Sequence, residues 1–278
     1  MKIGILGLGL IGGSLGFDLR SQGHHVLGVS RESTCQKAVS LGSVDEASVE
    51  ISLLATAEVV FICTPIGLIV PQVNQLIAHL SATTVVTDVG SVKAPIVKAI
   101  SPLWSNFVGG HPMAGTADSG IEAAQRHLFV DRPYVLTPIN TTPSEAIAVV
   151  EEIVRSLGSK IYHCQPEQHD RAVSWISHLP VMISASLIAA CMGEPDPAVL
   201  QLAQNLASSG FRDTSRVGGG NPELGVMMAQ FNQQALLGSL QQYRHNLDKL
   251  IHLIEQEDWA ALETKLQSTQ KARLEFVE

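Results

Sequence analysis

The stretch KIGILGLGLIG, residues 2–12, decides the fold expected for the first half of the chain. A short apolar strand, residues 2–6, runs into three glycines spaced as Gly-x-Gly-x-x-Gly, and a helical pattern follows. A glycine run between a strand and a helix is typical of a dinucleotide-binding βαβ unit. We expect Gly7 to permit a tight turn, Gly9 to let a pyrophosphate approach, and Gly12 to allow close helix packing.

The same unit predicts which dinucleotide binds. Free N–H groups at the start of the helix, at Leu10 and Ile11, would hold the pyrophosphate. The second strand, residues 25–29, ends in Ser30 and Arg31, where an NAD-binding chain would place Asp or Glu for the ribose 2′-hydroxyl. A carboxylate there would repel a 2′-phosphate, whereas a hydroxyl and a guanidinium would bind it. We therefore predict NADP as the cofactor.

Composition limits the class of protein. The 278 residues are 45% hydrophobic and 16% charged with a formal charge of −8, which indicates a globular chain and no basic stripe for nucleic acid. Lys2 directly follows Met1, so no signal peptide is expected. The longest apolar helix candidate, residues 179–192, is too short to span a bilayer. The four cysteines lack metal-type spacing. We expect a cytoplasmic enzyme with reduced thiols, binding no metal, membrane or nucleic acid.

Short apolar runs alternate with amphipathic helices up to residue 165. This alternation predicts a doubly wound, Rossmann-type α/β sheet covered on both faces. The expected strands cover residues 2–6, 25–29, 59–63, 85–88, 106–109, 134–137 and 160–163. The expected helices run from the glycines to Gln22 and cover residues 33–41, 68–80, 92–101 and 144–157.

Beyond Gln165 the strand pattern disappears, and an all-α region is expected. We therefore place a dinucleotide-binding domain at residues 1–165 and a helical dimerisation and substrate domain at residues 166–278. The expected helices cover about residues 166–192 with a bend at Pro180, 197–208, 223–255 and 258–274.

One of these helices carries a 3.5-residue apolar repeat, which marks a narrow seam against another helix. The repeat consists of Leu236, Leu240, Tyr243, Leu247, Leu250 and Ile254. The seam fits packing within one chain about as well as a subunit interface. A helical half of this size has a limited core of its own, which favours a homodimer through the C-terminal helices.

Open α/β sheets bind ligands beyond the carboxyl ends of their strands. Cys63, Thr64 and Pro65 follow one such strand and would line the nicotinamide-ribose side of the cleft. Ser91 follows another strand and would cap a helix starting at Val92 unless it contacts a ligand.

A third segment, GGHPMAGT at residues 109–116, contains the strongest catalytic candidate. The two glycines let the backbone pack closely before His111, and Pro112 keeps the chain extended. A histidine held rigidly beside a nicotinamide is a natural acceptor for the hydroxyl proton lost during hydride transfer. We predict that His111 is a general base.

Four motifs also carry a resemblance to a known family: TDVGSVK at residues 87–93, GHPMAGT at 110–116, SHLP at 177–180 and GFRDTSR at 210–216. With the glycine run, they resemble the prephenate/arogenate dehydrogenases of tyrosine biosynthesis over essentially the whole chain. The resemblance is greatest to NADP-dependent arogenate dehydrogenases.

The resemblance implies a cyclohexadienyl acid substrate, whose 4-hydroxyl becomes a carbonyl while carbon dioxide leaves and the ring aromatises. His111 would deprotonate the hydroxyl, and Ser91 would orient His111 or share that hydroxyl. Arg216, in a glycine-rich stretch expected to be flexible, would bind a substrate carboxylate. Thr116 is a further substrate-binding candidate, and His178 would either face the substrate or cap the broken helix.

Two positions depart from the family pattern. Many relatives that prefer prephenate read SHLPH, but Val181 occupies the fifth position here, and Ala117 stands where some relatives have an acidic residue. Loss of a histidine fits the amino group of arogenate at least as well as the keto group of prephenate. We predict arogenate, with prephenate or dual specificity as the alternative.

Two other classes of function remain to be weighed. β-Hydroxyacid dehydrogenases share the layout but use a lysine base on the first long helix after the cofactor domain, and no lysine lies between Lys160 and Lys249. The second class is a non-catalytic NADP sensor with the same fold, in which His111 and Arg216 would have no catalytic role. The spacing of His163, His169 and Asp170 matches no helical ligand pair, so no metal site is expected.

Overall fold

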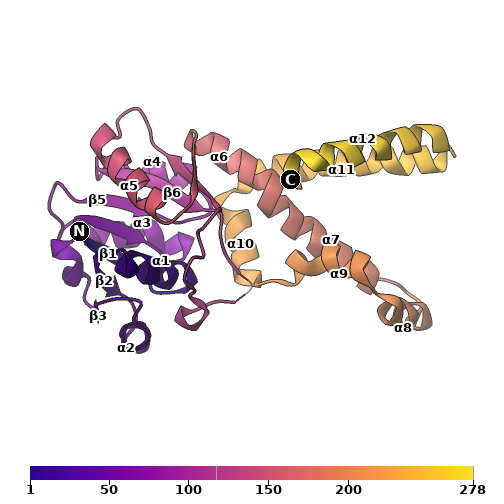
Figure 1. The fold of residues 1–278 in the computed structure, drawn as a ribbon. Helices are drawn as coiled ribbons and strands as arrows, with labels where there is room; N and C mark the ends of the chain where they lie inside the picture. Colours follow the sequence, from indigo (N-terminus) through magenta and orange to yellow (C-terminus); the bar gives the residue numbers. More distant parts are fainter. Residues whose placement is uncertain (117, 278) are drawn as a thin grey trace. The chain divides into compact units, whose positions relative to one another are not determined.

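The computed structural model describes residues 1–116 and 118–277, so the position of Ala117 lies outside the described residues. Its contacts divide the chain into two compact units, Met1–Asn232 and Gln233–Glu278. The first unit contains the sheet and the helices up to α10, and the second contains α11 and α12 (Figure 1).

The first unit is built on one eight-stranded sheet in the order β3-β2-β1-β4-β5-β6-β7-β8. Neighbouring strands are parallel except for β6 and β7. The strands are β1 (Lys2–Leu6), β2 (His25–Val29), β3 (Glu46–Ser48), β4 (Val59–Ile62), β5 (Val85–Asp88), β6 (Phe107–Pro112), β7 (Pro133–Thr137) and β8 (Lys160–His163). All seven predicted strands are present. The prediction missed β3 because its three residues, Glu-Ala-Ser, contain no apolar run.

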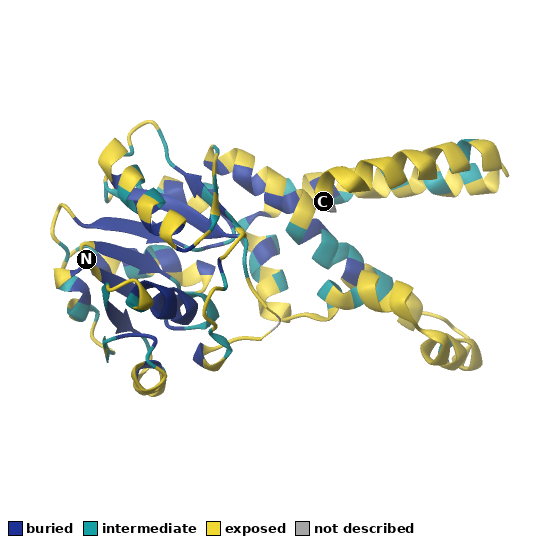
Figure 2. Ribbon diagram, viewed as in Figure 1, coloured by how far each residue is buried: buried dark blue, intermediate teal, exposed yellow. Residues whose placement is uncertain are grey.

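Alternate residues of the central strands face opposite sides of the sheet, as the two-residue period of a strand requires. Ile3 and Ile5 join the core beneath α1 (Leu10–Ser21) and α5 (Ser144–Ser156). The six inner strands are buried over most of their length, whereas the edge strands β3 and β8 are not (Figure 2). The predicted Rossmann-type sheet with helices on both faces is therefore confirmed.

The other face is covered by a second set of helices. Val60 and Ile62 join the core beneath η1 (Ile51–Thr56), α3 (Ile66–Leu76) and α4 (Ala94–Ile100). The 3-10 helix η1 was not predicted. The remaining helix of this half is α2 (Glu32–Ser40).

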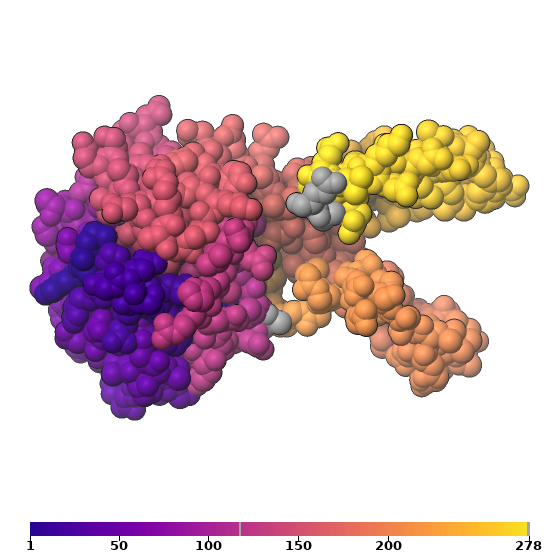
Figure 3. Space-filling model, viewed as in Figure 1, coloured from indigo at the N-terminus to yellow at the C-terminus, as the bar shows by residue number. Residues whose placement is uncertain are grey.

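The connection from β6 to β7 crosses α1 and contains the short helix η2 (Ile121–Ala123). The Gln125 N–H donates to Ser14 Oγ at 3.0 Å, and the His127 N–H donates to the Asp18 carboxylate at 3.0 and 3.1 Å. In Figure 3 this segment, in magenta, lies against the N-terminal elements in indigo and purple. The crossing connects the strand that carries His111 to the first helix of the glycine motif.

The helix that leaves the sheet runs without interruption from Pro166 to Met192, a length of 27 residues. It consists of α6 (Pro166–Val173), a π turn η3 (Ser174–His178) and α7 (Leu179–Met192). The irregularity therefore precedes Pro180, which has no N–H to donate to the preceding turn of this continuous helix.

This helix corrects the membrane argument made from length. It is long and apolar enough to cross a bilayer, with a mean hydropathy of 1.6 over an 18-residue window of which 17% is buried. The core helix of a water-soluble assembly meets the same criteria. Because α6 carries a buried His169 and Asp170, its first turns belong to the folded unit.

Two further sequence predictions are corrected here. The predicted helix over 223–255 is two helices, broken at Asn232, whose φ of −118° and ψ of 33° are not helical. The stretch around Arg216 is ordered, because Gly218 packs on α7 and its N–H donates to Ser184 Oγ at 2.8 Å. The helices of this part are α8 (Pro197–Leu206), α9 (Ser209–Ser215), η4 (Arg216–Gly219) and α10 (Pro222–Phe231).

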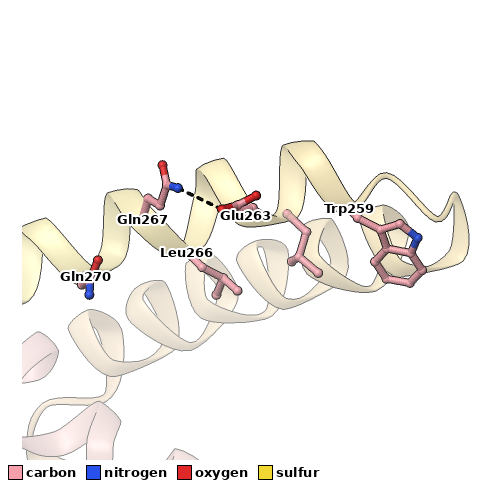
Figure 4. A pocket seen from close by; sticks show the side chains of 6 residues that line it. Trp259, Glu263, Leu266, Gln267 and Gln270 are labelled. Atoms are coloured by element: carbon pink, nitrogen blue, oxygen red, sulfur yellow. Dashed lines mark hydrogen bonds between the residues drawn. The ribbon is translucent and has the colours of Figure 1, made fainter.

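The second unit is a pair of packed helices, α11 (Gln233–Glu255) and α12 (Trp259–Val277). Tyr243, Leu247 and Ile254 of the apolar seam are exposed. An open hollow of about 480 Å³ runs along α12 (Figure 4). Its lining residues are Trp259, Leu262, Glu263, Leu266, Gln267 and Gln270, none of which is a predicted site residue. Within one chain, the apolar surface of these helices is only partly covered.

Candidate active site

The glycine motif forms a backbone cradle at the end of β1. Gly7 has a φ of +103°, and a Cβ there would lie 2.8 Å from the carbonyl of Cys63. A Cβ at Gly12 would lie 2.0 Å from the Gly7 oxygen, which would prevent this packing of α1. At Gly9 a Cβ would meet nothing within 4 Å, so the surface above it is open. The geometry fits a closely approaching pyrophosphate.

Polar groups around the cradle lack protein partners. No side chain caps α1 at Gly9, so the first N–H groups of the helix, at Leu10 and Ile11, remain available for an anion. Thr64 Oγ1 is buried and has no partner among the described residues. Pro65 then starts α3 as its N-cap. The donors at this edge of the sheet therefore suit a dinucleotide.

The end of β2 positions the residues predicted to read the ribose. Ser30 is half-buried, and its carbonyl accepts a hydrogen bond from Cys35 Sγ at 3.3 Å. Arg31 is exposed and precedes α2 as its N-cap. The next residue, Glu32, accepts a hydrogen bond from the Gln36 side chain at 2.9 Å, so this carboxylate is bonded to its own helix.

His111 lies on β6 at the start of a buried chain of side chains. Its Nδ1 lies 2.8 Å from His169 Nε2, and His169 Nδ1 lies 2.8 Å from Asp170 Oδ1. His111 is only 8% exposed and His169 only 2%. The chain therefore joins the predicted base to a carboxylate on α6, a helix that starts 55 residues after His111, at Pro166.

The surrounding hydrogen bonds determine which ring nitrogens donate and which accept along His111, His169 and Asp170. The Asp170 carboxylate accepts the N–H groups of Lys93 at 2.6 Å and Ala94 at 2.8 Å, so it is an acceptor for His169 as well. His169 Nδ1 then carries a hydrogen, and with both rings neutral His169 Nε2 accepts from His111 Nδ1. His111 Nε2 is left with a free lone pair, which a general base requires.

A buried ion pair fixes the strands on either side of His111. Lys93 and Asp88 are both fully buried and paired, and Lys93 Nζ also donates to the Gly110 carbonyl at 2.7 Å. Asp88 accepts the N–H groups of Gly90 at 2.8 Å and Gly110 at 3.2 Å. Burial lowers the pKa of Lys93, and Asp88 opposes that effect. Asp88 therefore fixes the turn that follows β5.

The environment keeps His111 neutral. Burial lowers the pKa of His111 well below its usual value, and a positive charge on His169, Lys93 or His178 acts in the same direction. Burial also lowers the pKa of His178, to about 4. Both imidazoles are therefore uncharged at neutral pH, so that His111 can accept a proton.

Ser91 does not cap the helix as its alternative role required. The helix α4 begins at Ala94, and the Asp170 carboxylate binds the N–H groups at its start. Ser91 is half-buried in the loop between Asp88 and Lys93. The contact that orients His111 comes from His169.

Arg216 and Thr116 lie outside the hydrogen-bonded chain. Arg216 is exposed on η4, which packs against α7. Thr116 is exposed, and its Oγ1 accepts the Asp118 N–H at 3.2 Å. Neither makes a contact with His111 among the residues the structure describes.

His178 is buried beside this chain, and its environment was not foreseen. Its Nδ1 lies 3.1 Å from Asn232 Nδ2, and the same amide nitrogen donates to the Asp170 carbonyl at 2.8 Å. The alternative of a helix cap does not apply, because His178 ends a π turn in the interior of the long helix.

Sequence reasoning missed four residues of this arrangement. It did not single out Lys93 or Asn232, and it considered His169 and Asp170 only as metal ligands. A lysine five residues after Asp88, and an adjacent His-Asp pair opening an apolar helix, were the available signals. Within residues 1–116 and 118–277, no group of three or more His, Cys, Asp or Glu side chains could hold a metal ion.

Two family profiles match the chain in succession. The prephenate dehydrogenase nucleotide-binding domain matches residues 15–163, and the prephenate dehydrogenase dimerization domain matches residues 165–268. A prephenate dehydrogenase of Bacillus subtilis is 31% identical over 91% of this chain and 70% of its own length.

Solved structures give the same result. The arogenate dehydrogenase of Synechocystis is 59% identical, covers 100% of both chains and superposes with a TM-score of 0.91. The prephenate dehydrogenase of A. aeolicus, in complex with hydroxyphenyl propionate and NAD+, is 27% identical, with coverage of 99% and 98% and a TM-score of 0.94.

Proposed function

Because this chain belongs to the prephenate dehydrogenase family and is an oxidoreductase, we propose that it converts arogenate to tyrosine with NADP⁺. The 4-hydroxyl of the substrate would become a carbonyl while carbon dioxide leaves and the ring aromatises. The chemistry supplied by a bound nicotinamide is acceptance of a hydride from the hydroxyl-bearing carbon. The rest of the work falls to side chains of this chain.

The hydrogen-bonded chain from His111 to Asp170 is the observation that carries this proposal. His111 Nε2 would accept the hydroxyl proton, and His169 would take a hydrogen bond from the opposite side of the ring. The Asp170 carboxylate would stabilise the positive charge that then develops on the two rings. Ser91, in the neighbouring loop, would share the substrate hydroxyl.

Arogenate is favoured by the start of α7. Val181 stands where many prephenate-preferring relatives have a histidine. A Cβ added at Gly225 would lie 3.9 Å from Val181 Cγ1, so the valine side chain is next to α10. This part of the surface therefore has an aliphatic group in place of a hydrogen-bonding one. The 59% identity with the Synechocystis arogenate dehydrogenase supports the same choice. Prephenate or dual specificity is the alternative.

NADP⁺ is favoured by the end of β2. Ser30 and Arg31 would bind the 2′-phosphate, and Glu32, which bonds to Gln36, would stay clear of it. Gly7, Gly9 and Gly12 would admit the pyrophosphate to the start of α1, with Cys63, Thr64 and Pro65 at the nicotinamide-ribose side.

Substrate carboxylates would be held by Arg216, with Thr116 and His178 as further contacts. We also propose a cytoplasmic homodimer, with a cofactor domain at residues 1–165 and a dimerisation domain at 166–278. The largely exposed apolar residues of α7, α8, α11 and α12 support an interface through these helices (Figure 2). Light scattering at micromolar concentration should give twice the chain mass of 29.7 kDa.

The test is a spectrophotometric assay of dinucleotide reduction with arogenate and prephenate, each with NADP⁺ and NAD⁺. We expect the highest kcat/KM for arogenate with NADP⁺. Equal or higher kcat/KM with prephenate would replace arogenate by the alternative, and activity confined to NAD⁺ would remove the role given to Arg31.

A further inference from the structure

His178 has one ring nitrogen bonded and the other buried without a protein partner. Its side chain is 0% exposed, and Nε2 lacks a partner among the residues described. The other nitrogen, Nδ1, lies 3.1 Å from Asn232 Nδ2. A buried polar atom that the protein leaves unpaired requires an explanation, and beside an active site a partner from outside the chain, such as a water or a ligand atom, provides one.

The contacts of Asn232 determine which kind of atom Nε2 can bind. The Asp170 backbone carbonyl can only accept, so the Asn232 atom 2.8 Å from it is the amide nitrogen. The second hydrogen of that amide then points to His178 Nδ1, which must accept it. In the neutral ring, the hydrogen is therefore on Nε2.

Hydrogen bonds connect His178 to the residues that support His111. His178 is the last residue of the turn formed by residues 174–178, and such turns shift the side chains beyond them around the helix axis. Asn232 joins His178 Nδ1 to the Asp170 carbonyl, and the Asp170 carboxylate bonds His169, which in turn bonds His111. Both histidines therefore serve one site.

We propose that Asn232 holds His178 in the Nε2–H tautomer and that this N–H donates a hydrogen bond to an oxygen of the bound substrate. The two imidazoles then have opposite roles, because Nε2 of His111 accepts and Nε2 of His178 donates. The substrate part of the proposal rests on the proposed function. The tautomer is a property of the protein without substrate.

The tautomer is measurable by long-range ¹H–¹⁵N correlation of histidine-labelled holoenzyme at pH 7.5. We expect His178 to show a pyrrole-like Nε2 and a pyridine-like Nδ1, with its signals identified by their loss in His178→Gln. A pyrrole-like Nδ1 in the wild type would overturn the proposal. This readout does not depend on which substrate the enzyme turns over, so it stands apart from a failure of the activity assay.

Asn232→Asp tests the positioning role. A carboxylate cannot donate to Nδ1, so Nδ1 should become pyrrole-like and the affinity for substrate should fall. Asn205→Asp, on the exposed helix α8, is a matched control that should change neither the His178 spectrum nor the affinity for substrate. An unchanged His178 spectrum in Asn232→Asp would show that Asn232 does not set the tautomer.

Binding to the enzyme with its dinucleotide identifies the oxygen. We expect His178→Leu to weaken binding of 3-(4-hydroxyphenyl)propionate about tenfold or more, and His178→Gln, which retains an N–H donor, to weaken it less. If His178→Leu weakens the binding of 3-phenylpropionate equally, the oxygen belongs to the carboxylate. If the binding of 3-phenylpropionate is unchanged, the oxygen is the ring hydroxyl. Wild-type affinity for both acids in a folded His178→Leu protein would refute donation to the substrate.

Discussion

His111 Nδ1 lies 2.8 Å from His169 Nε2, and the two ring planes meet at 73°. The ring edge of His111 is therefore held by a second imidazole, which is itself bonded to Asp170. The proposed base, the histidine that supports it and the carboxylate are thus three buried residues joined by hydrogen bonds. Several variants separate their contributions.

Replacing His111 by Asn should remove the proton acceptor and preserve much of the shape. We expect kcat to fall by about 10²–10⁴, as for loss of a general base, with little change in dinucleotide affinity. Steady-state kinetics and fluorescence titration of the cofactor measure the two quantities. A variant that turns over at the wild-type rate would exclude His111 as the base.

His169→Leu should leave the His111 Nδ1–H without its acceptor. We expect kcat to fall by about 10- to 100-fold, by analogy with the loss of partners that orient metal-binding histidines. His163→Leu is the matched control. His163 is partly exposed, and its Nε2 lies 2.9 Å from Glu151 Oε1, outside the His111–His169–Asp170 chain. Equal effects of the two variants on kcat would contradict a supporting role for His169.

Ser30→Asp combined with Arg31→Ala should reverse the charge offered to the 2′-phosphate. The variant should lose affinity for NADP⁺ and relatively favour NAD⁺, because a carboxylate repels the phosphate and accepts from a free 2′-hydroxyl. The ratio of kcat/KM for the two dinucleotides measures the preference. An unchanged ratio would show that another part of the surface recognises the phosphate.

Arg216→Ala should raise KM for the cyclohexadienyl substrate without lowering the melting temperature, because the side chain is exposed. Arg212→Ala is the control, since Arg212 is also exposed and pairs with its neighbour Asp213 at 3.1 Å. A lower melting temperature with normal KM would assign Arg216 to stability alone.

The two depressed histidine pKa values predict how stability depends on pH. In the unfolded chain each imidazole titrates near 6.5, whereas in the folded protein the pKa of His178 is about 4 and that of His111 is also lowered. Their contribution to stability is complete above pH 6.5 and is lost as pH falls toward the folded values. Urea unfolding at pH 8 and pH 5 should therefore show a loss that is smaller in His178→Gln. The same pH dependence in both proteins would contradict this origin.

Local sequence patterns were enough to predict seven of the eight strands of the sheet. The run from Gly7 to Gly12 and the seven apolar strands are local features, and the geometry around each follows from sterics and periodicity. The His111–His169 contact joins residues 58 positions apart and depends on how α6 packs, which no local pattern encodes. The break at Asn232 is likewise invisible in a continuous helical pattern, because a single residue leaves the helix.

The π turn at residues 174–178 changes the direction in which side chains leave the long helix, so α6 and α7 differ in helical phase. One extra residue per turn amounts to roughly a 100° rotation, so the directions of side chains before and after the turn are set separately. Removing one residue from the turn would leave His169 on its partner but rotate Val181 and everything after it around the axis. The number of residues in this turn therefore fixes how the side chains of α7 are rotated relative to His169 and Asp170 on α6.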